Sequence, residues 1–253
     1  MLEEQGYLVL AANTEHTDYV SLARRLAQSI HQWHPAACVA LLTNTVGNYP
    51  EFSHVIDMDI IDPVNPWAND SQIFYKTPFR ETIKLEADMI MASPCDHWWS
   101  MFRHKDVVVS TGCRNWQDQV SNDRTYRKIF DQNSLPDVYN AITYWRRSTT
   151  AREFFDLVRD IFADWATYSR TLRYPEQQPS TDVVYAMAAQ IMGPERVTLP
   201  FATYPKIVHM KSAHAGTQRQ NWTEELVWET DPLRIQTIAQ WGAFHYNIKD
   251  WQP

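Results

Sequence analysis

Two carboxylates, Glu86 and Asp88, stand one residue apart where a short apolar strand is expected to end. Successive side chains of a strand point to opposite faces, so residues two apart project from the same side. Two carboxylates on one side can bind a single hard divalent cation, and such a cation can hold a diphosphate. The spacing indicates a candidate metal site, although two solvated acids on an edge strand would leave the same pattern.

The first 45 residues predict the unit that must position such a site. Residues 6–12 form a continuous apolar run, which is typical of a strand buried on both faces in a parallel sheet. Apolar residues from Tyr19 to Trp33 recur at helical spacing, Pro35 ends that helix, and residues 39–42 read as a second buried strand. Nucleotide-binding α/β domains begin in this way.

Glycine-rich phosphate loops are missing from the sequence. No Gly-x-Gly-x-x-Gly follows the first strand, no Walker motif occurs, and the chain holds only six glycines. These absences argue against the classical dinucleotide and P-loop folds.

The later elements are expected in this order: a loop over 57–71, a short helix, the acidic strand, a strand over 107–109, a long polar loop over 111–136, a strand over 139–144, a helix opened by a capping box at 150–153, a helix from about Ser180, and a last strand over 206–211.

Composition narrows the class of protein further. The chain of 253 residues is predicted to form one domain, and its formal net charge of −7 argues against a general nucleic-acid coat. The charge is uneven, because residues 103–147 hold eight Lys or Arg against five Asp or Glu, which would suit a polyanion. Cys38, Cys95 and Cys113 are too scattered for a disulfide framework or a zinc knuckle. With no apolar run near the roughly 20 residues of a membrane span and no signal-peptide pattern, the expected location is the cytoplasm.

Several short stretches, taken in order, resemble one known family over most of the chain. They are Ala11-Ala12-Asn13 with Asp18-Tyr19, the segment 75–88, Tyr139-Asn140-Ala141, Thr181-Asp182, and His209-Met210-Lys211 with Gly216 and Trp222. Together they resemble the nucleotide-sugar glycosyltransferases of the GT-A fold, in particular the glycogenin-like and galactosyltransferase-like branch. The resemblance implies a single α/β, Rossmann-like GT-A domain over 1–253, with a mostly parallel central sheet flanked by helices. Residues 1–110 would form the nucleotide-sugar-binding half, and 111–253 the acceptor-binding half and C-terminal closing segment.

The resemblance also assigns roles to individual residues. Glu86, Asp88 and a histidine near the chain end, His209, would bind Mn²⁺ or Mg²⁺, and this metal would bridge the two phosphates of a UDP-sugar. The chain departs from the usual Asp-x-Asp motif by having Glu86 first. A nitrogen ligand beside carboxylates suits Mn²⁺ better than Ca²⁺. The other implied contacts are Ala11, Asn13 and Tyr19 with the uridine, Lys76, Arg80 and Ala87 with the donor sugar or its phosphates, Lys211 with the diphosphate, and the catalytic residues Asn140 and Asp182, the latter holding a sugar hydroxyl or deprotonating the acceptor.

The predicted function is metal-dependent transfer of a hexose or pentose from a UDP-sugar to a hydroxyl acceptor. The first candidate acceptor is a 5-hydroxymethyl-pyrimidine in DNA, as in small phage enzymes of this kind. The basic region 103–147 would bind the DNA, and Trp116 or Tyr126 would supply a stacking surface for a flipped base. A glycan, protein or small-molecule acceptor would leave the same marks. A nucleotidyltransferase and a catalytically inactive carbohydrate-binding protein are the remaining alternatives. The sequence does not specify the sugar, the anomeric outcome or the oligomeric state.

Overall fold

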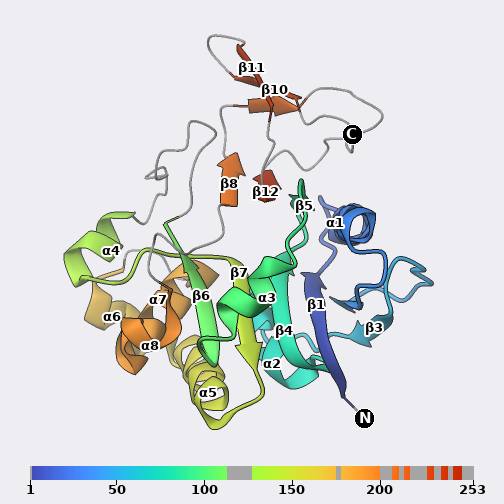
Figure 1. Ribbon diagram of the computed structural model, residues 1–253. Helices are drawn as coiled ribbons and strands as arrows, with labels where there is room; N and C mark the ends of the chain where they lie inside the picture. Colours follow the sequence, from blue (N-terminus) through green and yellow to red (C-terminus); the bar gives the residue numbers. More distant parts are fainter. Residues whose placement is uncertain are drawn as a thin grey trace.

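A six-stranded sheet forms the centre of the molecule (Figure 1). The computed structural model describes residues 2–112, 127–174, 178–199, 207–210, 214–216, 227–230, 235–238 and 242–246. Within them the strand order is β3-β2-β1-β4-β7-β6. The strands are β1 (Glu3–Ala11), β2 (Val39–Thr43), β3 (His54–Asp57), β4 (Phe79–Glu86), β6 (Val107–Thr111) and β7 (Val138–Arg146).

The sheet is mostly parallel. β1 runs parallel to β2 and β4, and β2 runs parallel to β3. β7 is antiparallel to both β4 and β6, so it is the one reversed strand of this sheet in the described residues. The predicted fold class, an α/β domain with a mostly parallel central sheet, is therefore confirmed.

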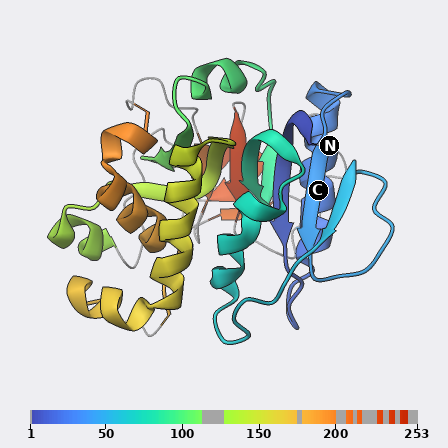
Figure 2. The same ribbon diagram turned by 90° about the horizontal axis from the view of Figure 1, so that it is seen from below.

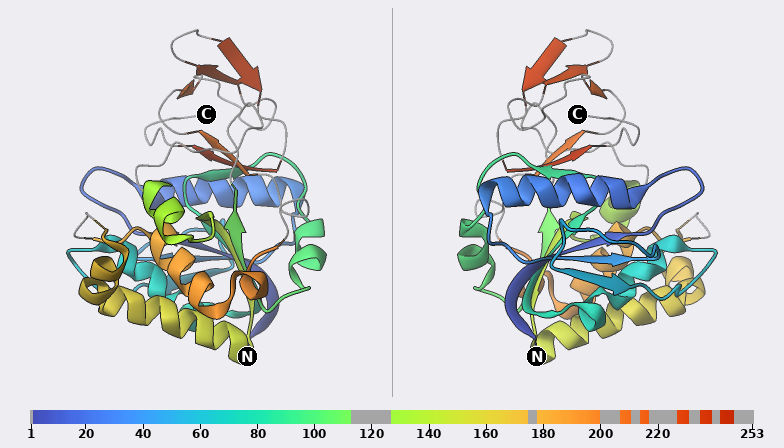
Figure 3. Two further views of the ribbon diagram at one scale, coloured as in Figure 1. Left: turned by 90° about the vertical axis from the view of Figure 1, so that its left-hand side faces the viewer. Right: turned by 90° about the vertical axis from the view of Figure 1, so that its right-hand side faces the viewer.

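Helices cover both faces of the sheet because its strands are apolar on both faces. Along β1, Tyr7 and Val9 belong to the core under α1 and α3, whereas Leu8 packs in the core under α5 and α7. Figure 2 shows α5 beside α7, and Figure 3 shows α1 and α5 on opposite sides of the strands. The helices are α1 (Tyr19–Trp33), the 3-10 helix η1 (Pro66–Gln72), α2 (Ile73–Lys76), α3 (His97–Phe102), α4 (Arg127–Asn133), α5 (Thr149–Ala163), α6 (Trp165–Leu172), α7 (Thr181–Met192) and α8 (Pro194–Val197).

Two small sheets complete the described structure. In the first, β12 (Ala243–Tyr246) pairs antiparallel with β5 (Met89–Met91) and parallel with β8 (Ile207–Met210). In the second, β10 (Val227–Thr230) lies between β9 (His214–Gly216) and β11 (Ile235–Ile238). Gly242 precedes β12 and has a φ of 62°. Its carbonyl accepts a hydrogen bond from the Ala92 N–H, and its N–H donates to the Ser93 hydroxyl. A glycine suits this left-handed conformation because it carries no Cβ.

Several local predictions need correction. The N-cap of α5 is Ser148, whose side chain accepts from the Ala151 N–H at 3.1 Å, so the helix begins before the predicted capping box. The predicted loop over 57–71 holds most of η1, and part of the predicted loop over 111–136 is α4. The strand at 207–210 is followed by four more. By contrast, the first βαβ unit and the helix capped by Ser180 are confirmed. None of the described helices is long and apolar enough to cross a membrane.

Candidate functional site

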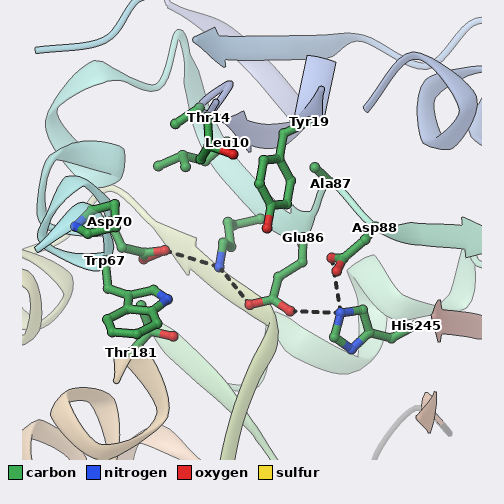
Figure 4. Close-up of a pocket in the computed structure, with 13 residues that line it drawn as sticks. Leu10, Thr14, Tyr19, Trp67, Asp70, Glu86, Ala87, Asp88, Thr181 and His245 are labelled. Atoms are coloured by element: carbon green, nitrogen blue, oxygen red, sulfur yellow. Dashed lines mark ion pairs between the residues drawn. The ribbon is translucent and has the colours of Figure 1, made fainter. Parts of the chain in front are cut away.

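A cavity of about 310 Å³ opens where β1 and β4 end (Figure 4). Ligands of open α/β sheets bind at the carboxyl ends of the strands, so the location is the expected one. Its walls come from the end of β1 and the following loop, from the starts of α1 and α7, from η1, from β4 with the turn after it, and from β12. The lining residues are Leu10, Ala12, Thr14, Tyr19, Pro66, Trp67, Asp70, Lys84, Glu86, Ala87, Asp88, Thr181 and His245.

Glu86, Asp88 and His245 form a candidate metal centre in this cavity. Each offers one ligand atom, and these atoms all lie within 4.8 Å of one another. Nε2 of His245 is 3.0 Å from Oδ1 of Asp88 and 3.3 Å from Oε2 of Glu86, and both carboxylates point toward the ring (Figure 4). Two carboxylates with one imidazole form a donor set that suits Mn²⁺ or Mg²⁺, and the nitrogen favours Mn²⁺.

Strand pairing explains how residues so far apart in the chain meet. β4 ends at Glu86, Asp88 lies in the turn that follows, and β5 begins at Met89. β12 pairs with β5 so that His245 stands opposite Met89, next to Asp88. The Tyr139 hydroxyl hydrogen-bonds Nδ1 of His245, which leaves Nε2 facing the carboxylates. A partner on the second ring nitrogen fixes the orientation of a metal-binding histidine.

A buried ion pair lies beside the candidate metal centre. Nζ of Lys84 is 3.1 Å from Oδ2 of Asp70 and donates to the Asn140 carbonyl at 3.1 Å. It also lies 4.0 Å from Oε1 of Glu86. Complete burial alone would lower the pKa of Lys84, but the carboxylates of Asp70 and Glu86 outweigh it, and the pKa is raised. Lys84 is therefore a fixed cation in the wall of the cavity.

Four of the predicted site residues meet in the cavity, namely Tyr19, Glu86, Ala87 and Asp88. Tyr19 is half buried at the start of α1, and burial and the nearby Glu86 carboxylate both raise the pKa of its hydroxyl. Leu10, near the end of β1, and Ala12, just after it, line the same cavity. This arrangement leaves a phenol ring beside the acidic pair.

Four other predicted residues lie behind or beside the cavity. Ala11 is fully buried in β1. Asn13 fixes the loop before α1, because its side chain accepts from the Val20 N–H at 2.9 Å. Asn140 donates its backbone N–H to Oδ1 of Asp182 at 2.7 Å, and both are buried. Neither is among the residues of the described chain that line the cavity, so their catalytic roles stay predictions.

The remaining predicted residues are dispersed. Lys76 pairs with Asp59 at 2.9 Å outside the cavity. Arg80 is exposed near the beginning of β4, six residues before Glu86, which places the two roughly 20 Å apart along the strand. The backbone of His209 lies in β8 opposite His245, but its side chain is outside the described structure, as is all of Lys211. Their ligand roles stay predictions.

Asp70, Lys84, Trp67 and His245 were not foreseen as site residues. One signal was available for Lys84, because it lies two residues before Glu86 on the same face of β4. Asp70 and Trp67 belong to η1, which lies in a segment expected to be a loop. The pairing of β12 with β5 brings in His245, and this long-range pairing leaves no local pattern in the sequence.

The basic region over 103–147 is largely engaged within the molecule where it is described. Arg103 donates to Glu81 and Gln5, each at 2.7 Å, and Arg146 pairs with Asp106. Lys105 bonds to the Glu195 carbonyl, and Arg147 to the Thr77 carbonyl at 3.1 Å. Trp116 and Tyr126 lie outside the described residues.

No protein-family model matches the sequence, and no curated protein is similar to it in sequence. Solved structures do match. A galactosyltransferase, LgtC, in complex with donor and acceptor sugar analogs is 11% identical over 95% of this chain and 86% of that one, with a TM-score of 0.54. Mouse xyloside xylosyltransferase 1 is 10% identical over 83% of this chain and 88% of that one, with a TM-score of 0.52. The glycosyltransferase GlyE of Streptococcus pneumoniae TIGR4 is 9% identical over 78% of this chain and 46% of that one, with a TM-score of 0.51. At such low identity these similarities show the fold, which is the predicted GT-A fold.

Proposed function

We propose that the protein is a metal-dependent glycosyltransferase that moves a sugar from a nucleoside diphosphate sugar, UDP-sugar first, to a hydroxyl acceptor. The observation that carries this proposal is the cluster of Glu86, Asp88 and His245 at the carboxyl end of β4. It lies in a cavity with room for a ligand, and on a fold that solved glycosyltransferases share.

The donor set fits a divalent cation, as two carboxylates and one imidazole face a common point. When bound, Mn²⁺ or Mg²⁺ supplies positive charge that neutralises the diphosphate as the glycosidic bond breaks. The chain's own residues would position the donor. Tyr19 offers a flat ring to the base, and Thr181 offers a hydroxyl to the sugar or its phosphate.

Asp182 stays the predicted base for an inverting transfer, and Lys211 the predicted partner of the diphosphate. Asp182 is buried, and its carboxylate accepts a hydrogen bond from the backbone N–H of Asn140. Asp182→Asn would show whether this carboxylate deprotonates the acceptor or only holds a sugar hydroxyl. A loss of kcat with an unchanged donor KM supports a base, because only the transition state then loses an interaction.

For the acceptor, a hydroxymethylated base in DNA is proposed from the excess of basic residues over 103–147. Lys128 in α4 is an exposed cation of that region and is the one to test, with Arg103 as an internally paired control. DNA binding that relies on phosphate contacts weakens steeply with added salt. Binding indifferent to salt would move the choice to a glycan, protein or small-molecule acceptor.

The deciding experiment is release of UDP from a panel of UDP-hexoses and UDP-pentoses, with and without Mn²⁺, and mass spectrometry of the product. Transfer to hydroxymethylated DNA or to simple glycans, abolished by EDTA, supports the proposal. Transfer of a nucleotidyl group would identify a nucleotidyltransferase instead. Binding of UDP-sugars without any product would identify a carbohydrate-binding protein.

A further inference from the structure

The buried pair of Asp70 and Lys84 is not itself part of the metal ligand set. Their side chains are only 6% and 3% exposed, and their charged atoms lie 3.1 Å apart. The fully buried Tyr185 donates its hydroxyl to the other oxygen of Asp70. Desolvating two charges costs several kcal/mol per ion, and apolar replacements of buried pairs are often neutral or stabilising. Stability alone therefore does not account for this pair.

The geometry of Glu86 connects the pair to the metal centre. Oε1 of Glu86 is 4.0 Å from Nζ of Lys84, and Oε2 is 3.3 Å from Nε2 of His245. The carboxylate therefore lies between a fixed cation and the imidazole, with one oxygen toward each. Lys84 cannot move away from this position, because Asp70 and the Asn140 carbonyl hold its ammonium group.

We propose that Lys84, held by Asp70, is a positioning residue that fixes the Glu86 carboxylate for binding of a divalent cation. This inference rests on the proposed function, since it concerns the same metal centre. Glutamate has one more rotatable bond than aspartate, so a glutamate ligand loses more side-chain freedom when it binds. A neighbouring fixed cation removes part of that freedom in advance, and this explains how the chain uses Glu86 where the family it resembles has aspartate.

The test uses the double variant Asp70→Asn with Lys84→Met, which removes both charges. The net charge around the metal centre is unchanged, and no unpaired charge is left buried. The measurement is isothermal titration of metal-free protein with MnCl₂ alone. The affinity for Mn²⁺ is expected to fall roughly 10- to 100-fold, as is usual when the partners of metal ligands are removed. The matched control is Arg24→Met with Glu51→Gln, which neutralises an ion pair outside the cavity and should keep the wild-type affinity.

Glu86→Gln, introduced into the wild type and into the double variant, separates positioning from a structural effect. If Lys84 acts through Glu86, this substitution weakens Mn²⁺ binding by a larger factor in the wild type than in the double variant. Equal losses in the two backgrounds, or wild-type affinity in the double variant, would overturn the inference while the proposed function stands. A wild type that neither binds Mn²⁺ nor transfers sugar would overturn the proposed function itself.

Circular dichroism and thermal unfolding show whether the double variant folds. If it does not, Tyr185→Phe takes its place, because this change removes only the hydroxyl that holds Asp70. A weaker affinity for Mn²⁺ is again expected, and an unchanged affinity would overturn the inference.

Discussion

Replacing Asp88 by asparagine should leave the metal-free protein at least as stable as the wild type and should reduce the stabilisation that metal provides. Asparagine keeps an oxygen that faces His245 and removes one negative charge. The ligand oxygens of Glu86 and Asp88 lie within 4.8 Å, so their repulsion at an effective dielectric constant of 20 is about 3.5 kcal/mol. Because the Glu86 side chain is 28% exposed, solvent screening reduces this to about 1 to 2 kcal/mol. In EDTA the variant should therefore melt at or above the wild-type temperature.

Metal should stabilise the wild type more than the variant. At a free concentration of about 100 times the Kd, Mn²⁺ stabilises the wild type by about 2.7 kcal/mol, or roughly 5 to 11 °C in Tm for a chain of this size. Removing a residue that only hydrogen-bonds a metal ligand already weakens metal binding about 10- to 100-fold, so removing the ligand itself should weaken Mn²⁺ binding by at least that factor. At the same Mn²⁺ concentration the variant then gains only about 0.4 to 1.4 kcal/mol.

Differential scanning calorimetry with EDTA and with MnCl₂ measures both effects. Asp106→Asn is the matched control, because Asp106 is a partly buried carboxylate paired with Arg146 and lies outside the cavity. It should keep the full metal-induced shift. An Asp88→Asn protein with the wild-type shift, or a wild type without any shift at millimolar MnCl₂, would refute the assignment of the metal centre.

Three further outcomes are expected. Burial raises the pKa of the Cys95 thiol to about 11, so iodoacetamide at about pH 8 should label Cys95 in urea but not in the native protein, as read by mass spectrometry; native labelling would contradict its burial. A Cβ on Gly6 would lie 2.3 Å from the buried Phe79 ring, so Gly6→Ala should lower the free energy of unfolding in urea by about 1 to 3 kcal/mol, whereas Gly47→Ala, which meets only the end of the partly exposed Tyr49 side chain, should cost less. The hydrogen bond from Arg24 lowers the pKa of Glu51, so the carboxylate stabilises the fold fully above its unfolded pKa of about 4.3 and progressively less as the pH falls through its lower folded value. Glu51→Gln should therefore lower the free energy of unfolding by about 0.2 to 1 kcal/mol near pH 7 and by less near pH 3. A loss of stability that grows on acidification would contradict this.

Local patterns in the sequence predict the first half of the fold well. The apolar run of β1 and the helical spacing of α1 depend on burial of neighbouring residues, so a short window contains the whole signal. Part of the site follows the same rule, because Glu86 ends a strand that the sequence locates, with Asp88 just beyond it. His245 does not, since its place depends on the register between β5 and β12, more than 150 residues apart in the chain. Arg80 lies near the beginning of β4 and Glu86 at its end, because proximity in sequence is not proximity in space along an extended strand.

The charges of the cavity support the proposed metal dependence. Its described wall holds three carboxylates, Asp70, Glu86 and Asp88, and one ammonium group, that of Lys84. With a neutral His245 the formal sum is −2, so the protein alone repels a diphosphate. A divalent cation bound by Glu86, Asp88 and His245 would cancel that sum and supply positive charge for the phosphates. The role of Lys84 is correspondingly specific, since its charge is already compensated by Asp70. In the proposed arrangement it would contribute little net attraction for the donor and would instead fix the Glu86 carboxylate. The neutral double variant, rather than loss of Lys84 alone, therefore tests the arrangement.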